Sequence, residues 1–136
     1  MDVIFKENSK IPGDAVLSLY DDAGWSAYTR EPERLLRAME SSLLTITAWQ
    51  GDSLVGLVRA VGDGETILYI QDILVLKSCK RRGIGRQLLT RLLDRFGHVR
   101  QKVLLTDDTA ETRGFYQAMG FVACDKGEQL AYVKFN

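Results

Sequence analysis

The sequence has little of what several protein classes require. It contains two cysteines, two prolines and one histidine among 136 residues. Two cysteines cannot build the disulfide framework of a small secreted domain, so we expect Cys79 and Cys124 to be reduced thiols. His98 and these two distant cysteines give no recognisable metal-ligand spacing, and we expect no metal cofactor.

Net charge and long apolar segments are also missing. Eighteen Lys and Arg balance eighteen Asp and Glu, so the molecule as a whole has no electrostatic reason to bind nucleic acid or an acidic membrane. Unbroken apolar runs reach four residues, as at 67–70 and 73–76, far below the roughly 20 that a membrane span needs. Residues 1–6 do not resemble a secretory signal, which predicts a cytoplasmic protein.

What is present indicates a folded α/β chain. Hydrophobic residues make up 46% and charged residues 26%, which excludes a disordered or low-complexity chain. The length favours one domain spanning 1–136. The apolar period switches repeatedly between two and three-to-four residues, which is typical of mixed α/β structure.

Apolar spacing and turn residues place the individual elements. Strands are predicted at 2–7, 43–50, 54–61, 66–76, 102–106, 121–124 and 130–135. Helices are predicted at 14–20, from Pro32 onward, from Ile84 to Phe96 and at 110–119. We expect 66–76 to be the longest strand, Asp107 and Asp108 to cap the helix at 110–119, and the last two strands to form a closing hairpin.

A basic segment with two glycines carries the strongest functional signal. Four cations surround the predicted start of the helix at Ile84: Lys80, Arg81, Arg82 and Arg86. Each is disfavoured there by roughly 0.3–1 kcal/mol, because a helix N-terminus is itself positive. Gly83 and Gly85 would let free backbone N–H groups approach a phosphate closely. We interpret the segment as an anion site, with a solvated basic surface as the alternative.

The familiar nucleotide loops do not fit this segment. It lacks the Lys-Ser/Thr pair of a Walker loop, and Leu88 occupies the third-glycine position of a Rossmann fingerprint. Lys80-Arg81-Arg82-Gly83-Ile84-Gly85 instead resembles the acetyl-CoA motif Gln/Arg-x-x-Gly-x-Gly/Ala of the GCN5-related N-acetyltransferase (GNAT) superfamily. Lys80 departs from the first motif position, since it keeps the cation but loses the planar fork of an arginine.

The resemblance implies a GNAT-like fold, in which about four helices flank a mixed sheet of about seven strands. It implies acetyl-CoA as cosubstrate, with the preceding strand pairing with the pantetheine arm and the basic loop holding the pyrophosphate. The positions that carry over are Ile73, Leu74, Val75, Lys80, Arg81, Arg82, Gly83, Ile84, Gly85 and Arg86.

A second segment resembles the late motif of the same family. Residues 109–121 end in Phe115-Tyr116, three further residues and Gly120-Phe121. The resemblance assigns Tyr116 as the general acid that protonates the departing thiolate, a role that a phenol with pKa near 10 can fill at neutral pH. A core tyrosine packed beside Phe115 is the alternative. Thr109 stands where many members carry an asparagine.

The acceptor side is less well marked. An amine must lose its proton before attack, and Asp72 is the one acid within the long predicted strand, so we nominate it as the base. A structural carboxylate is the alternative, and Glu65 is a weaker candidate. Trp25 and Tyr28 lie in the region where, in this family, side chains line the site of the amine that accepts the acetyl group. This region faintly resembles the branch that acetylates arylalkylamines such as serotonin, or lysines.

These observations predict an acetyl-CoA-dependent N-acetyltransferase that transfers the acetyl group by direct attack. The acceptor is a small-molecule amine or a protein amine, and neither nucleic acid nor membrane is expected as a partner. A non-catalytic acyl-CoA sensor or interaction module is the alternative, and a small nucleic-acid-binding domain is disfavoured by the zero net charge. The residues do not set the oligomeric state, and a homodimer stays open.

Overall fold

The computed structural model describes residues 2–136 and divides the chain into two compact units. The first unit ends at Leu105 and the second begins at Thr106. The first carries a sheet and four α-helices, and the second carries one α-helix and a short 3₁₀ turn among its residues. Each unit is described by itself.

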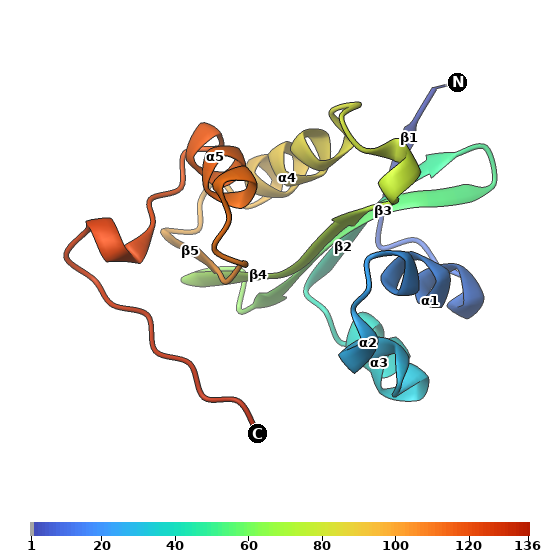
Figure 1. The fold of residues 1–136 in the computed structure, drawn as a ribbon, viewed down its shortest axis with the longest axis horizontal. Coiled ribbons are helices and arrows are strands. Elements are labelled where there is room, and N and C mark those ends of the chain that lie inside the picture. Colours follow the sequence, from blue (N-terminus) through green and yellow to red (C-terminus); the bar gives the residue numbers. More distant parts are fainter. Residues whose placement is uncertain (1) are drawn as a thin grey trace. The chain divides into compact units, whose positions relative to one another are not determined.

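The first unit is built on a five-stranded sheet with the order β1-β2-β3-β4-β5 (Figure 1). Its strands are β1 (Ile4–Glu7), β2 (Leu44–Gln50), β3 (Ser53–Gly62), β4 (Ile67–Val75) and β5 (Gln101–Leu104). The first four strands pair antiparallel and β5 joins β4 in parallel, so the sheet is mixed as expected. The predicted meander and its turn at 51–53 are confirmed, but β3 with ten residues is longer than β4 with nine.

Helices cover both faces of this sheet. They are α1 (Gly13–Asp22), α2 (Ser26–Thr29), α3 (Pro32–Glu40) and α4 (Ile84–Arg95). Leu57 of β3 packs with Val16 and Leu19 of α1, whereas the neighbouring Gly56 faces α4. Because successive strand residues point to opposite faces, α1 and α4 lie on opposite sides of the sheet (Figure 1). The short α2 is an addition to the helices that the sequence predicted.

Gly56 brings the start of α4 close to β3. A Cβ atom at this position would lie 3.1 Å from Leu88 Cδ1, 3.2 Å from Ile84 Cγ2 and 3.3 Å from the carbonyl oxygen of Leu74. Ile84, Leu88, Leu89 and Leu92 of α4 are all buried. The apolar stripe predicted for this helix therefore fixes its first turn against the sheet.

The second unit contains α5 (Ala110–Ala118), which begins at a capping box. The Thr109 hydroxyl accepts the backbone N–H of Thr112 at 3.1 Å, and Thr112 Oγ1 accepts the N–H of Thr109 at 3.3 Å. The expectation that Asp107 and Asp108 cap this helix is wrong. The Thr109 hydroxyl already takes the capping position by accepting the N–H of Thr112, and Asp108 instead pairs with Arg113 at 2.6 Å.

The predicted closing hairpin is also wrong, which leaves five strands rather than about seven. Residues 121–123 and 127–136 have no regular secondary structure, and Cys124–Lys126 forms a 3₁₀ turn. A two-stranded hairpin is marginal without a third strand or a helix against its apolar face. Strand-like side chains alone therefore do not produce strands in this segment.

The structure also shows the state of the two cysteines and the character of the helices. Cys79, which is buried, and Cys124, which is exposed, are both free. Within residues 2–136, no helix combines the length and the apolar character needed to cross a bilayer.

Candidate functional site

The basic loop turns into α4 through two residues with left-handed backbone conformation. Arg81 has φ 65° and Gly83, the N-cap of α4, has φ 77°. No side chain caps the helix, so the N–H groups of its first turn are available to an anion. A glycine adopts this conformation at little cost, which explains its place at the N-cap.

The cations of this loop are exposed and form no ion pair with the acidic residues that the structure describes. Lys80, Arg81, Arg82 and Arg86 are all exposed, and every ion pair found within residues 2–136 involves other arginines. Arg82 Nη1 lies 3.5 Å from the amide oxygen of Gln50. The loop therefore gathers positive charge around a helix N-terminus that already favours an anion.

The strand before this loop has one edge that β5 leaves uncovered. β4 pairs with β5 from Ile67 to Ile70, while its pairing with β3 continues as far as Val75. Gln71 is an extra residue in β4, because Arg59 faces Asp72 and Ala60 faces Ile70. Beyond this bulge, Ile73, Leu74 and Val75 follow an edge away from β5.

Hydrogen-bond directions show which groups line that edge. The N–H of Leu76 donates to the carbonyl of Val55 at 2.9 Å, toward β3. Since successive N–H groups of a strand point to opposite edges, the N–H of Val75 points to the edge that β5 leaves uncovered. That N–H group is free to bind an added strand or an oxygen atom.

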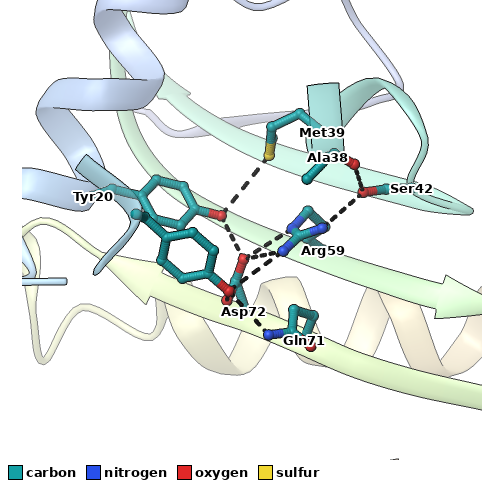
Figure 2. A network of polar contacts seen from close by, with 8 residues as sticks. Tyr20, Ala38, Met39, Ser42, Arg59, Gln71 and Asp72 are labelled. Atoms are coloured by element: carbon teal, nitrogen blue, oxygen red, sulfur yellow. Dashed lines mark hydrogen bonds and ion pairs between the residues drawn. The ribbon is translucent and has the colours of Figure 1, made fainter. Parts of the chain in front are cut away.

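Asp72 lies at the centre of a buried polar cluster (Figure 2). Its Oδ2 accepts hydrogen bonds from the Tyr20 hydroxyl at 2.8 Å and from Arg59 Nε at 2.9 Å. Its Oδ1 accepts a hydrogen bond from the Tyr28 hydroxyl at 2.9 Å. Asp72 is 3% exposed and Arg59 is 5% exposed. The carboxylate predicted as a base is thus enclosed by three donor side chains.

Arg59 supplies the charge that opposes Asp72. Its Nη2 lies 2.9 Å from Asp72 Oδ2, and its Nη1 donates to the Ser42 hydroxyl at 3.3 Å. Burial acts to lower the pKa of Arg59, but the charge and hydrogen bonds of Asp72 outweigh it and hold this pKa above its usual value. The two buried side chains together carry no net charge.

Three aromatic rings pack beside this pair. The Tyr20 ring contacts those of Trp25 and Tyr28 edge-on, with centroids 5.8 and 5.1 Å away, and Trp25 and Tyr28 are 6.2 Å apart. Tyr20 is fully buried, whereas Trp25 and Tyr28 are partly exposed. Burial, followed by the Asp72 charge, raises the pKa of Tyr20, and burial also raises that of Tyr28. Both phenols therefore stay protonated at neutral pH.

Tyr28 links the buried pair to the exposed bulge. Its hydroxyl accepts a hydrogen bond from Gln71 Nε2 at 3.0 Å, and Gln71 is exposed. The Tyr28 hydroxyl therefore connects the buried Asp72 carboxylate to the exposed Gln71 side chain. The partly exposed Trp25 and Tyr28 rings lie next to each other beside it. We call these two rings, with Gln71, the aromatic ledge.

Tyr116 belongs to the second unit. It lies on α5, and its ring contacts those of Phe115 and Phe121 edge-on, with centroids 5.0 and 5.9 Å away. The backbone carbonyl of Tyr116 accepts the N–H of Phe121 across the turn at Gly120, whose φ is 91°. Burial raises the pKa of Tyr116, so that its phenol is protonated at neutral pH.

The structure brings Asp72, nominated as the base, close to Trp25 and Tyr28, which the sequence nominated together as acceptor-binding residues. Sequence reasoning missed Tyr20, Arg59 and Gln71. The ion pair does leave a signal in the sequence. Arg59 is the one charged residue in the predicted strand 54–61, and Asp72 is the one charged residue in the next predicted strand. Glu65, the weaker base candidate, lies in the turn before β4, where its N–H binds Asp63.

Comparison with known proteins identifies the family. The acetyltransferase (GNAT) domain matches residues 14–135 of this chain. The chain belongs to the GNAT acetyltransferase family. A solved GNAT family protein from Streptococcus pneumoniae TIGR4 is 33% identical, with a TM-score of 0.87, and the match covers 99% of this chain and 98% of that one.

Two other relatives carry functional names. Serotonin N-acetyltransferase 2, chloroplastic, from Oryza sativa subsp. japonica is 36% identical over 102 residues, which are 68% of this chain and 48% of that protein. This GNAT chain thus spans about half the length of that relative. An aminoglycoside N-acetyltransferase solved with CoA is 17% identical, covers 98% of this chain and 95% of its own, and has a TM-score of 0.73. At that identity it shows the shared fold alone.

Proposed function

We propose that this GNAT domain is an acetyl-CoA-dependent N-acetyltransferase. The observation that carries the proposal is the basic turn at the start of α4. There, free N–H groups surround a left-handed glycine, together with four exposed cations that form no ion pair among residues 2–136. A pyrophosphate fits this turn, because the helix N–H groups can bind its oxygen atoms and its negative charge can offset the four cations. The aminoglycoside N-acetyltransferase that shares this fold was solved in complex with CoA.

The edge of β4 is the proposed place of the pantetheine arm. Ile73, Leu74 and Val75 follow the bulge at Gln71, past the end of the pairing with β5. Backbone N–H and C=O groups on that edge can pair with the amides of pantetheine as they would with a strand. The Val75 N–H is proposed to stabilise the negative oxygen that forms when the thioester is attacked.

The proposed reaction is direct transfer from a bound thioester to an amine. Acetyl-CoA supplies the acetyl group as its thioester. The amine nitrogen bonds to the carbonyl carbon, the carbon–sulfur bond breaks, and Tyr116 gives its proton to the leaving sulfur. Burial raises the pKa of Tyr116, so its phenol holds the proton that the proposed role has it donate.

Asp72 is the proposed acceptor of the amine proton. Because Asp72 is buried beneath Tyr20, Tyr28 and Arg59, the proton is proposed to arrive through the Tyr28 hydroxyl. That hydroxyl receives the proton from the amine side and passes its own proton to Asp72 Oδ1, 2.9 Å away. Trp25 and Tyr28 are the proposed acceptor-binding residues.

Two measurements separate catalysis from mere cofactor binding. Calorimetric titration with acetyl-CoA should show saturable binding, and an absence of heat at high micromolar cofactor would remove the basis of the proposal. A panel of amines and peptides with thiol detection then tests transfer. CoA release that depends on the acceptor supports the enzyme, whereas binding without release favours an acyl-CoA sensor.

The acid role of Tyr116 has its own test. Tyr116→Phe should lower kcat by roughly 10²–10⁴-fold, which is the contribution of a positioned general acid, and leave the Kd for acetyl-CoA nearly unchanged. Tyr132→Phe is a matched control, since Tyr132 is 88% exposed. A Tyr116→Phe variant with the wild-type kcat would assign this tyrosine to packing with Phe115 and Phe121.

A further inference from the structure

The basic loop before α4 is held at both of its ends. At the far end, Ile84 is buried against β3, where Gly56 leaves room for it. At the near end, β4 passes into a 3₁₀ turn (Lys77–Cys79), whose Cys79 is buried. Residues 80–83 connect these two points. The position of the 3₁₀ turn therefore helps to decide where the N–H groups and cations of the loop lie.

The Asp22 side chain holds the first residue of this turn. Its Oδ2 accepts the backbone N–H of Lys77 at 2.8 Å, although the two residues are 55 positions apart in the sequence. The N–H groups that open a helical turn have no partner within it, and a carboxylate is a strong acceptor for them. Asp22 thus fixes the junction between β4 and the basic loop from a different part of the chain.

The end of α1 is a firm support for this contact. Tyr20 of α1 is fully buried, and its hydroxyl donates to Asp72 at 2.8 Å. The N–H of Trp25, in the aromatic ledge, donates to the carbonyl of Tyr20 at 3.2 Å. Asp22 lies between these two anchored residues, so it ties the basic loop to a part of the molecule that the core already fixes.

The charge of Asp22 is unfavourable where it lies. Asp22 belongs to the last turn of α1, where the helix carbonyls already make the terminus negative. Asp21 adds a like charge next to it, and this turn holds no basic residue. A carboxylate at the edge of a basic loop also weakens the binding of an anion through space. The hydrogen bond to Lys77 is the contact that accounts for an aspartate at this position.

We infer that Asp22 is a positioning residue for acetyl-CoA binding. Through the Lys77 N–H it fixes the near end of the basic loop, and with it the N–H groups and cations that receive the pyrophosphate. Asp22 acts through the loop and does not touch the cosubstrate. This inference rests on the proposed function and deepens it by naming a residue outside the motif on which the acetyl-CoA site depends.

The charge and the hydrogen bond of Asp22 act on the Kd for acetyl-CoA in opposite directions, so substitutions separate them. Asp22→Ala removes both, and we expect the Kd from calorimetry to rise roughly tenfold, because the turn loses a hydrogen bond to a charged group. Asp22→Asn keeps an oxygen that accepts the Lys77 N–H, so its Kd should equal or fall below the wild-type value. Asp21→Ala removes an exposed carboxylate one residue away and should stay within about twofold of the wild type.

Amide hydrogen exchange measures the contact itself and does not depend on activity. Exchange of the Lys77 amide, followed by NMR without acetyl-CoA, should be at least roughly tenfold faster in Asp22→Ala and near the wild-type rate in Asp22→Asn. The amide of Leu19, in the buried part of α1, should keep its rate in both variants. If Leu19 exchange accelerates as much as that of Lys77, Asp22 supports α1 as a whole, which would overturn the inference.

The remaining outcomes separate this inference from the proposed function. An unchanged or lower Kd for Asp22→Ala would overturn the inference, as would equal rises for Asp22→Ala and Asp22→Asn. If Asp22→Ala does not fold, Asp22→Glu decides, because it keeps the charge but displaces the carboxylate by one methylene group. Its Kd should then rise severalfold, and a wild-type Kd would overturn the inference. Absence of acetyl-CoA binding by the wild-type protein would instead defeat the proposed acetyltransferase function.

Discussion

The basic loop at the start of α4 and the polar cluster around Asp72 hold charges in opposite ways. In the loop, four exposed cations share one short segment and have no acidic partner within residues 2–136. In the cluster, Arg59 and Asp72 are buried, and residues from separate helices and strands complete their hydrogen bonds. The loop is thus prepared for an external anion, whereas the cluster is complete without a ligand.

This contrast indicates that the charges of the loop contribute to ligand binding, whereas those of the cluster contribute to folding stability. Exposed like charges near a helix N-terminus oppose folding slightly, and they contribute favourably when an anion binds. Removing either partner of a buried ion pair leaves an uncompensated charge in the interior, which strongly destabilises a protein. Variants of the cluster should therefore change stability, while variants of the loop should mainly change affinity for acetyl-CoA.

The largest effect is expected from Asp72→Asn. The substitution leaves the Arg59 guanidinium buried without a counter-charge, and we expect the free energy of unfolding to fall by about 3–5 kcal/mol. Urea denaturation followed by circular dichroism measures it. Asp52→Asn, in the exposed turn between β2 and β3, should stay within about 0.5 kcal/mol of the wild type. A loss as small for Asp72→Asn would show that the cluster does not stabilise the fold.

The loop could be predicted from the sequence because its signal is local. Lys80 to Gly85 lie next to one another, and the apolar stripe that follows marks the helix they precede. The cluster depends on pairing between distant segments. Tyr20 and Asp72 are 52 residues apart, and the bulge at Gln71 decides which residue faces Arg59. The spacing of residues along the chain does not predict how β3 and β4 pair on either side of this bulge.

The same limit explains the errors in the second unit. Residues 130–135 have strand-like side chains, but whether they form a strand depends on a partner that their own spacing does not reveal. Thr109, by contrast, stands where many GNAT members carry an asparagine. Its structural role is local, since the hydroxyl caps α5 together with Thr112.

A smaller effect is expected from Gly83→Ala in the loop. Nothing lies within 4 Å of a Cβ at Gly83, so its φ of 77° is the source of the cost, about 1 kcal/mol of stability. We expect the Kd for acetyl-CoA to rise by roughly tenfold or more, because the added methyl group stands beside the free N–H groups. Thermal unfolding and calorimetry measure the two effects.

Gly114→Ala provides the matched control for that substitution. Gly114 lies inside α5 and also has nothing within 4 Å of a Cβ, but it has no positive φ. The same exchange should there stabilise the protein by roughly 0.5–1 kcal/mol. A Gly83→Ala protein that kept the wild-type affinity for acetyl-CoA would contradict the prediction that the loop binds this cosubstrate.

The smallest effect is the pH dependence that Tyr28 adds to the stability of the cluster. Burial raises the pKa of Tyr28 above its unfolded value near 10. The neutral phenol is therefore favoured in the folded state, and its stabilising contribution is complete below about pH 10 and is lost as the pH rises through the folded pKa. Tyr28→Phe removes this titrating group, so the fall in unfolding free energy between about pH 9 and 11 should be shallower than in the wild type.

Urea denaturation across that alkaline range tests the prediction against a matched exchange outside the cluster. Tyr132→Phe removes a phenol that is 88% exposed, and its alkaline slope should match that of the wild type. Gly83→Ala, with its change confined to the loop, should shift the whole curve without altering the slope. Equal slopes for Tyr28→Phe and Tyr132→Phe would mean that the interior position of Tyr28 does not couple its ionisation to folding.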